Sequence, residues 1–129
     1  MAMFMQRFGG QTYALLRIVS GFLFLWHGAS KLFEFPKASG APEWIVHAAG
    51  PIELIGGTLI MLGLFTRQAA FISSGMAAVA YFLVHAGRSL FPIINGGELV
   101  AFFCFTFLYI SAHGAGIWSI DGLRGKSGG

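Results

Sequence analysis

Four long apolar stretches dominate this sequence, at about residues 12–33, 44–65, 68–87 and 97–115. Each is close to the ~20 residues that an α-helix needs to cross about 30 Å of hydrocarbon. The third stretch lacks the polar stripe that a helix of a soluble bundle presents to water, and none of the four alternates as a membrane β-strand does. The sequence therefore predicts an all-α, polytopic membrane protein folded as a four-helix bundle.

The composition supports a single membrane domain. Only 10% of the 129 residues are charged, against about 25% in ordinary soluble domains. The length suits one domain over residues 1–129, because domains usually contain roughly 100 to 150 residues. The lipid bilayer is thus the expected partner. Lys and Arg residues occur singly despite the net charge of +3, so a nucleic-acid partner is not expected.

The single cysteine, Cys104, lies within the fourth apolar stretch. One cysteine cannot form an intrachain disulfide or a Cys-x-x-Cys redox pair. A metal site built from Cys and His ligands is not expected either. Dithiol chemistry within the chain is therefore excluded.

Charged residues in the connections predict an orientation. Because Lys and Arg are retained on cytoplasmic loops, the more basic side of the bundle should face the cytoplasm, and both termini lie on that side. That side carries Arg7, Arg67, Arg124 and Lys126. The other side carries Lys37 and Arg88 together with Glu34 and Glu43.

A very short connection at Thr66 and Arg67 joins the second and third stretches, and it predicts an antiparallel helical hairpin. Small residues allow helix backbones to approach closely in lipid. We expect Gly56, Gly57 and Gly63 of the second stretch to face the small residues of the third.

Ionisable residues within the apolar stretches are the candidates for function. Charged groups at membrane depth cost roughly 2.5 to 3.5 kcal/mol each, so several together require partners or a polar cavity. Arg17, His27 and Lys31 fall within roughly 80° of one another around the first helix and should point inward. The other three stretches contribute Glu53, His85 and Glu98 toward the predicted outer face. The predicted site therefore contains His27, Lys31, Glu53, His85 and Glu98, with Arg17 as a further candidate.

Simpler interpretations remain open for some of these residues. Lys31, His85 and Glu98 could extend to interfacial water, and Glu98 could simply favour a helix N-terminus. Lys31 could pair with Glu53 or with Glu98. Arg17 could reach the cytoplasmic interface or join a structural pair. A bis-histidine haem would need His27 and His85 to face each other, and it is not expected, because helical histidines more often join hydrogen-bond networks.

Several motifs resemble those of the DoxX family and cover nearly the whole chain. They are LLRIVSGFLFLWHGASKLF from Leu15, ELIGG from Glu53, GLFTRQAA from Gly63, MAAVAYFLVH from Met76, NGGEL from Asn95 and SIDGL from Ser119. The resemblance implies a four-helix, multi-pass protein of the bacterial inner membrane. Members of the family are associated with quinone-linked sulfur oxidation, with oxidative-stress complexes and with uncharacterised roles.

The positions carried over from the family motifs include all six residues of the candidate site. They are Arg17, His27, Gly28, Lys31, Glu53, Gly57, Thr66, Arg67, His85, Asn95, Gly96, Gly97 and Glu98.

Three functional hypotheses follow. The first is a quinone-linked or redox-partner membrane subunit, in which the polar cluster binds a quinone head group and exchanges its protons. The second is a noncatalytic anchor or docking partner for a soluble redox or stress enzyme. The third is a small transporter or proton pathway, although four short helices leave little room for alternating access. A homo-oligomer is compatible with all three, and the sequence does not decide whether the chain is catalytic.

Overall fold

The computed structural model describes residues 2–34 and 42–125, and within these ranges every regular element is a helix and there is no strand. A 3₁₀ segment, η1 (Ala2–Phe8), leads into α1 (Gly9–Phe33). The other long helices are α2 (Glu43–Leu62), α3 (Thr66–Ala80) and α5 (Glu98–His113). A π-helical turn, η2 (Tyr81–His85), extends α3, and two short helices complete the fold, α4 (Pro92–Asn95) and α6 (Ile120–Leu123).

The predicted all-α membrane chain is confirmed. Three helices are long and apolar enough to cross a membrane, over Met3–Phe33, Glu43–Leu62 and Thr66–His85. The fourth apolar helix, α5, has 16 residues and is shorter than the stretch predicted at 97–115. A helix of that length extends about 24 Å, so a fourth crossing stays a prediction. Lys37 and Lys126, on which the predicted orientation partly depends, lie outside the described residues.

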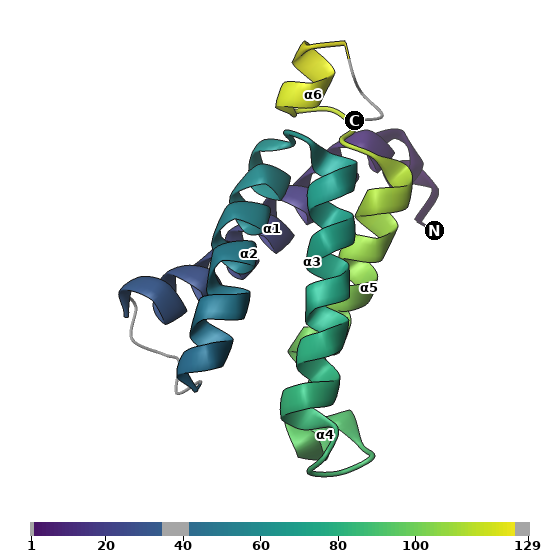
Figure 1. Cartoon of the computed structure of the whole chain (residues 1–129). Helices are drawn as coiled ribbons and strands as arrows, with labels where there is room; N and C mark the ends of the chain where they lie inside the picture. Colours follow the sequence, from purple (N-terminus) through teal and green to yellow (C-terminus); the bar gives the residue numbers. More distant parts are fainter. Residues whose placement is uncertain (1, 35–41, 126–129) are drawn as a thin grey trace.

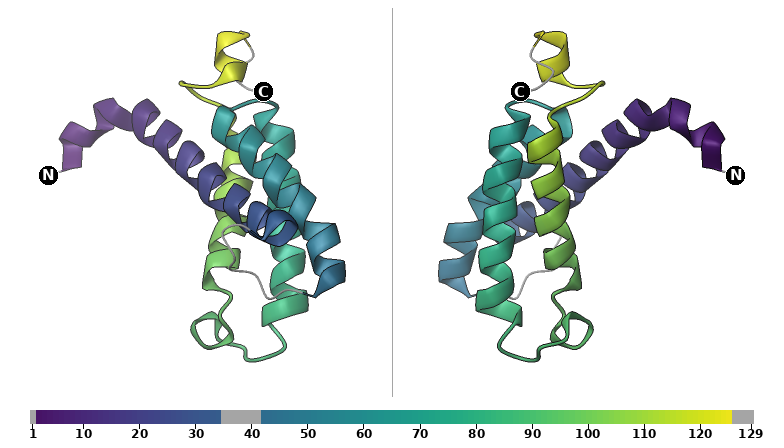
Figure 2. Two further views of the ribbon diagram at one scale, coloured as in Figure 1. Left: turned by 90° about the vertical axis from the view of Figure 1, so that its left-hand side faces the viewer. Right: turned by 90° about the vertical axis from the view of Figure 1, so that its right-hand side faces the viewer.

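The long helices are arranged as two packed pairs. Helix α1 crosses α2 obliquely, while α3 and α5 run side by side (Figures 1 and 2). Helices α2 and α3 meet at their short connection and diverge from it along their length (Figure 1). Segments η1 and α6 lie in the same half of the molecule as this connection, and α4 lies at the opposite end (Figure 1).

Glycines set the approach of α1 to α2. A Cβ built on Gly57 would lie 2.6 Å from the backbone nitrogen of Leu25. A Cβ built on Gly21 would lie 2.6 Å from the carbonyl oxygen of Gly57. Side chains at these positions would therefore force the two backbones apart. The expectation that Gly57 and Gly63 face the third helix is wrong, because the nearest atoms to a Cβ built on Gly63 belong to Ser119 and Arg17. Gly56 does face Ser73 of α3, its built Cβ lying 2.5 Å from that hydroxyl oxygen.

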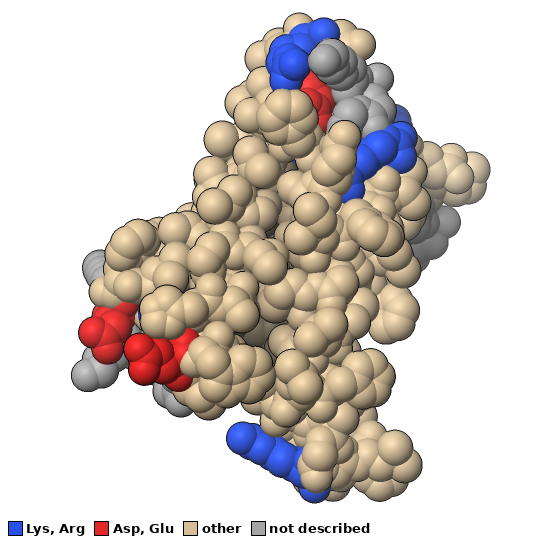
Figure 3. Space-filling view, in the orientation of Figure 1, with Lys and Arg blue, Asp and Glu red and all other residues tan. Residues whose placement is uncertain are grey.

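Aromatic side chains fill the centre between α1 and α5. The ring centroids of Phe24 and Phe107 lie 4.8 Å apart, and those of Phe24 and Phe103 lie 5.2 Å apart. Ile60 and Ile110 are fully buried beside them. On the face drawn in Figure 3, charged side chains gather toward the two ends of the molecule, and an uncharged belt separates them. This distribution suits a protein whose middle lies in hydrocarbon.

Candidate functional site

An ion pair connects α1 to α2 within the predicted outer half. Lys31 is in the last turn of α1, and its Nζ lies 2.6 Å from Oε1 of Glu53 on α2. The Lys31 side chain is 14% exposed and the Glu53 side chain 7%. Each charge would be costly at this depth if it were alone, so each offsets the desolvation of the other. Of the two partners that the sequence offers Lys31, the structure selects Glu53.

This ion pair forms part of the wall of a cavity of about 430 Å³ between the two helix pairs. Ligand cavities in proteins usually have volumes of roughly 300 to 1,000 Å³. Four of the five predicted site residues line this cavity. Its polar lining consists of His27, Lys31, Glu53, His85 and Arg88, and its apolar lining includes Phe24, Ala49, Met76, Ala80, Val84 and Phe103. The structure thus brings ionisable groups of α1, α2 and η2 to one space.

His27 presents a ring with free hydrogen-bonding capacity. Its ring packs edge-to-face on Phe103, with 5.8 Å between the centroids. Within residues 2–34 and 42–125, its two ring nitrogens have no hydrogen-bond partner. A neutral imidazole offers one donor and one acceptor. His27 can therefore either donate to or accept from a ligand in the cavity.

His85 is held in position by the turn that precedes α5. Its Nδ1 lies 3.1 Å from the carbonyl oxygen of Asn95. Because a carbonyl oxygen can only accept, Nδ1 carries the proton in this contact, and Nε2 of the neutral ring is an acceptor. Asn95 is itself fully buried. Its Nδ2 donates to the hydroxyl of Tyr81 at 3.0 Å and to the carbonyl of Ser89 at 3.1 Å.

The structure adds Arg88 to the site. The sequence places this residue on an outer connection, but its side chain lines the cavity beside His85. Ala77, Ala80 and Val84 also line the cavity, at helical spacings of three and four residues, and Arg88 is four residues further on. This continuing stripe is the sequence signal that could have identified Arg88.

The structure does not bring Glu98 into the cavity. Glu98 is exposed on the other face of α5, where it lines a separate hollow with Phe102, Phe105 and Tyr109. Its neighbours Leu99 and Val100 line the polar cavity instead. Glu98 therefore has the position expected for an anion at a helix N-terminus.

Arg17 lies in the N-terminal half of α1, toward the opposite end from Lys31, and is fully buried. Its Nε donates to the carbonyl of Ile60 at 3.1 Å. Its Nη1 donates to the carbonyls of Ala115 and Ile117 at 2.5 and 3.0 Å, and its Nη2 to that of Trp118 at 2.6 Å. Four carbonyls thus surround this guanidinium, and Arg17 holds the segment after α5 against α1 and α2.

Asp121 completes the closure of that end. Its Oδ2 accepts hydrogen bonds from the backbone nitrogen and the hydroxyl of Thr66, at 3.0 and 2.9 Å. Its Oδ1 accepts from the backbone nitrogen of Phe65 at 3.2 Å. Burial raises the pKa of this carboxyl, but the hydrogen bonds from Thr66 and Phe65 outweigh it and hold the pKa below its ordinary value. The carboxylate therefore caps α3 from a distant part of the chain.

Comparison with known proteins identifies the family of this chain. An uncharacterised protein of Haemophilus influenzae is 47% identical, over 84% of this chain and 87% of its own length. A Bacillus subtilis protein named "Putative oxidoreductase CatD" is 39% identical, over 41% of this chain and 44% of its own length. No solved structure matches the chain. The DoxX family model matches residues 12–86, which contain most of α1 and all of α2, α3 and η2, and the chain therefore belongs to the DoxX family.

Proposed function

We propose that this protein is a quinone-linked or redox-partner membrane subunit and that the polar cavity binds a quinone head group. The observation that carries the proposal is the meeting of His27, the Lys31–Glu53 pair and His85 around one cavity of about 430 Å³. Membership of the DoxX family and the name of the Bacillus subtilis relative support a redox association.

The cavity offers the contacts that a quinone head group needs. A quinone ring has two carbonyl oxygens that accept hydrogen bonds, and its hydroquinone form donates from two hydroxyls. The ammonium of Lys31 and the ring of His27 are available donors, and Nε2 of His85 is an available acceptor. Phe24 and Phe103 supply apolar surface for the ring itself.

A bound quinone would supply two-electron, two-proton chemistry. Within this proposal the chain binds and orients the head group, while the electrons come from a reduced partner protein. His27 and His85 are placed to hold or exchange a proton at their ring nitrogens. The ion pair with Glu53 holds the ammonium of Lys31 at the wall of the cavity.

The proposal includes a placement in the membrane. We propose a four-helix bundle in the bacterial inner membrane, with both termini cytoplasmic and the cavity in the outer half. Support comes from Arg7, Arg67 and Arg124 in the half of the molecule that contains η1, the α2–α3 connection and α6. A homo-oligomer is compatible with this placement.

Binding to the protein in lipid nanodiscs tests the proposal. The probe is a quinone with one isoprene unit, and the readout is saturable quenching of tryptophan fluorescence. His27→Ala removes a contact to the head group, so the dissociation constant should rise by about tenfold, the equivalent of one lost hydrogen bond of about 1.4 kcal/mol. Glu98→Gln is the matched control, because Glu98 lines a different hollow, and it should leave the affinity unchanged.

Two results would contradict the proposal. One is the absence of saturable binding to the wild-type protein. The other is equal affinity of the wild-type and His27→Ala proteins in samples with the same thermal unfolding temperature.

A noncatalytic docking role has one observation of its own. Four large apolar side chains are exposed around α4, outside the long helices, with exposures of 60% to 86%. They are Leu90, Phe91, Ile93 and Ile94. Such a patch suits a protein partner at the membrane surface. Crosslinking from Ile93→Cys in native membranes should then give a discrete adduct, and lipid-only labelling would contradict this role.

The transporter or proton-pathway alternative draws less support from the geometry. Phe24 forms part of the cavity wall, and it packs with Ile60 and Phe107 in the buried core. Ile60 in turn accepts the hydrogen bond from Arg17. Apolar side chains therefore occupy the space between the polar cavity and Arg17.

A further inference from the structure

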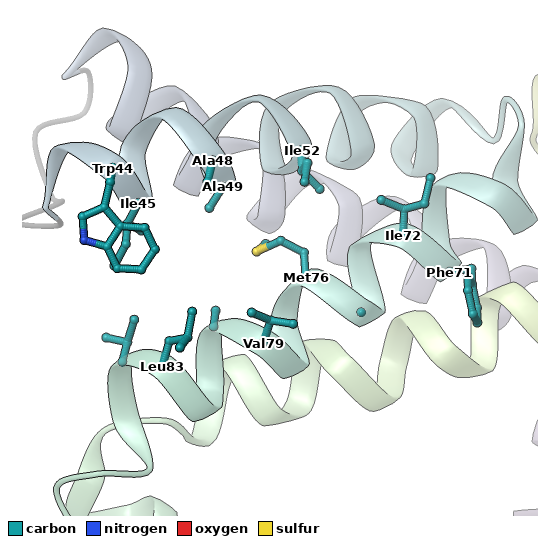
Figure 4. Close-up of a pocket in the computed structure, with 13 residues that line it drawn as sticks. Trp44, Ile45, Ala48, Ala49, Ile52, Phe71, Ile72, Met76, Val79 and Leu83 are labelled. Carbon is teal, nitrogen blue, oxygen red and sulfur yellow. The ribbon is translucent and has the colours of Figure 1, made fainter.

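An apolar groove runs along the divergence of α2 and α3. Its volume is about 430 Å³, and none of the residues that line it is charged. Trp44 and Ile52 of α2 lie across the groove from Leu83 and Met76 (Figure 4). Trp44 and Leu83 are 60% and 63% exposed, so the groove is open at the surface of the protein.

The groove and the polar cavity share part of their walls. Five residues line both spaces: Ile45, Ala49, Met76, Ala80 and Val84. Two of the five are alanines, and the side chain of Met76 extends from α3 into the space between α2 and α3 (Figure 4). Methionine is unbranched and flexible, so it can change its position at low cost. The boundary between the groove and the cavity is therefore thin and adjustable.

This continuity joins two different environments. On one side are the charges of Lys31 and Glu53 and the rings of His27 and His85. On the other side is a purely apolar channel that opens where lipid would surround the helices. A ligand that fits both must have a polar head group and a long apolar tail.

We propose that the α2–α3 groove is a lateral portal, through which a membrane quinone enters from the bilayer and in which its isoprenoid tail remains. This inference rests on the proposed function and names the route and the tail of its ligand. Lipid is as apolar as the groove, so the tail gains little affinity there. The groove mainly raises the rate of association, because it lets the head group reach the cavity while the tail stays among apolar groups.

The cavity also has a second approach. Pro42, Arg88 and Gly96, all exposed, line it at the end away from the core. A quinone with a short tail can leave the bilayer and enter there from water. A quinone with a long tail cannot leave the bilayer, so only the groove admits it.

Gly75 allows the portal to be blocked without distortion. It lies on α3, lines the groove but not the cavity, and a Cβ built on it has no atom within 4 Å. Gly75→Phe should therefore fill the groove while leaving the helix packing unchanged. Gly9→Phe is the matched control, because a Cβ on Gly9 also has no atom within 4 Å and Gly9 lines neither space.

The test compares quinones of one and eight isoprene units on the wild-type, Gly75→Phe and Gly9→Phe proteins in nanodiscs. Gly75→Phe should slow association of the long-tailed quinone by about tenfold or more, because a closed route lowers the association rate. Association of the short-tailed quinone should be unchanged, and Gly9→Phe should behave as wild type with both.

The outcomes separate the two proposals. If Gly75→Phe binds both quinones at wild-type rates, the portal is overturned while the quinone site stands. If Gly75→Phe slows both quinones equally while its unfolding temperature is unchanged, the substitution acts on the head-group site and not on a route that only long-tailed quinones need, and the portal is again overturned. If the wild-type protein binds neither quinone, the proposed function itself fails.

Discussion

Lys31 and Glu53 form an ion pair with 2.6 Å between Nζ and Oε1, and this contact joins the end of α1 to the middle of α2. Both side chains are largely buried. The same two helices approach closely at Gly28, where a Cβ would collide with the backbone nitrogen of Leu54. The glycine contact brings the helices together, and the ion pair neutralises the charges that this approach buries.

Removing one partner of the pair should destabilise the protein more than removing both. Lys31→Met or Glu53→Leu alone leaves a buried charge without its partner, and we expect each to lower the free energy of unfolding by about 3 kcal/mol. The double variant should be more stable than either single variant. Reversible unfolding in mixed micelles measures all four proteins, and additive losses in the double variant would contradict the pairing.

The close approach of α1 and α2 predicts a second set of effects. Gly57→Ala adds a Cβ 2.6 Å from the backbone nitrogen of Leu25, and it should cost about 1 to 3 kcal/mol of stability through overpacking. Gly75→Ala is the control in the middle of a helix, because nothing lies within 4 Å of its Cβ. We expect it to be neutral or slightly stabilising. Equal unfolding free energies for the two variants would contradict the tight contact.

The hydrophobic pattern predicts the membrane helices well, because length and apolarity depend only on local sequence. It also predicts that Arg17, His27 and Lys31 point inward from one face of α1, but His27 is exposed, whereas Arg17 is buried and Lys31 lines the cavity. Arg17 and Lys31 are 14 positions apart, which is about 21 Å along a helix. Sharing a face therefore does not make them one site.

Depth alone could not predict the composition of the cavity. Glu98 lies near the same end as His85, but it shares a helical face with Phe102, Phe105 and Tyr109. The inward face of α5 is the one that carries the buried Phe103. Helical spacing within α5 could have separated these faces. The groove between α2 and α3 could not have been predicted in the same way, because it depends on the angle between two helices.

Arg17 should control the order of the segment that follows α5. Arg17→Met removes the donors to the carbonyls of Ala115, Ile117 and Trp118, so amide exchange over residues 115–123 should become faster by about tenfold, the equivalent of roughly 1.4 kcal/mol. Hydrogen–deuterium exchange with mass spectrometry measures it. Arg7→Met is the control, because Arg7 stacks on the Phe8 ring instead. Unchanged protection of the segment in Arg17→Met would contradict the clamp.

Asp121 should make stability depend on acid pH. Burial opposes ionisation of this carboxyl, but hydrogen bonds from Thr66 and Phe65 lower its pKa in the folded protein. Because the folded pKa lies below the unfolded one, the unfolded state binds the proton first as pH falls. The stabilisation is therefore complete above about pH 4 to 5 and is lost as pH falls through the folded pKa.

The variant Asp121→Asn tests this dependence. At pH 7 it should be less stable than wild type by about 1 to 3 kcal/mol, because an amide replaces an oxygen that accepts two hydrogen bonds from Thr66. The difference in unfolding free energy between the two proteins should shrink as pH falls from 5 to about 3, since the wild-type carboxyl then becomes protonated and loses its charge. Unfolding curves at matched pH values measure the difference, and the other carboxylates cancel in the comparison. A difference that stays constant over this range would show that the charge of Asp121 does not stabilise the start of α3.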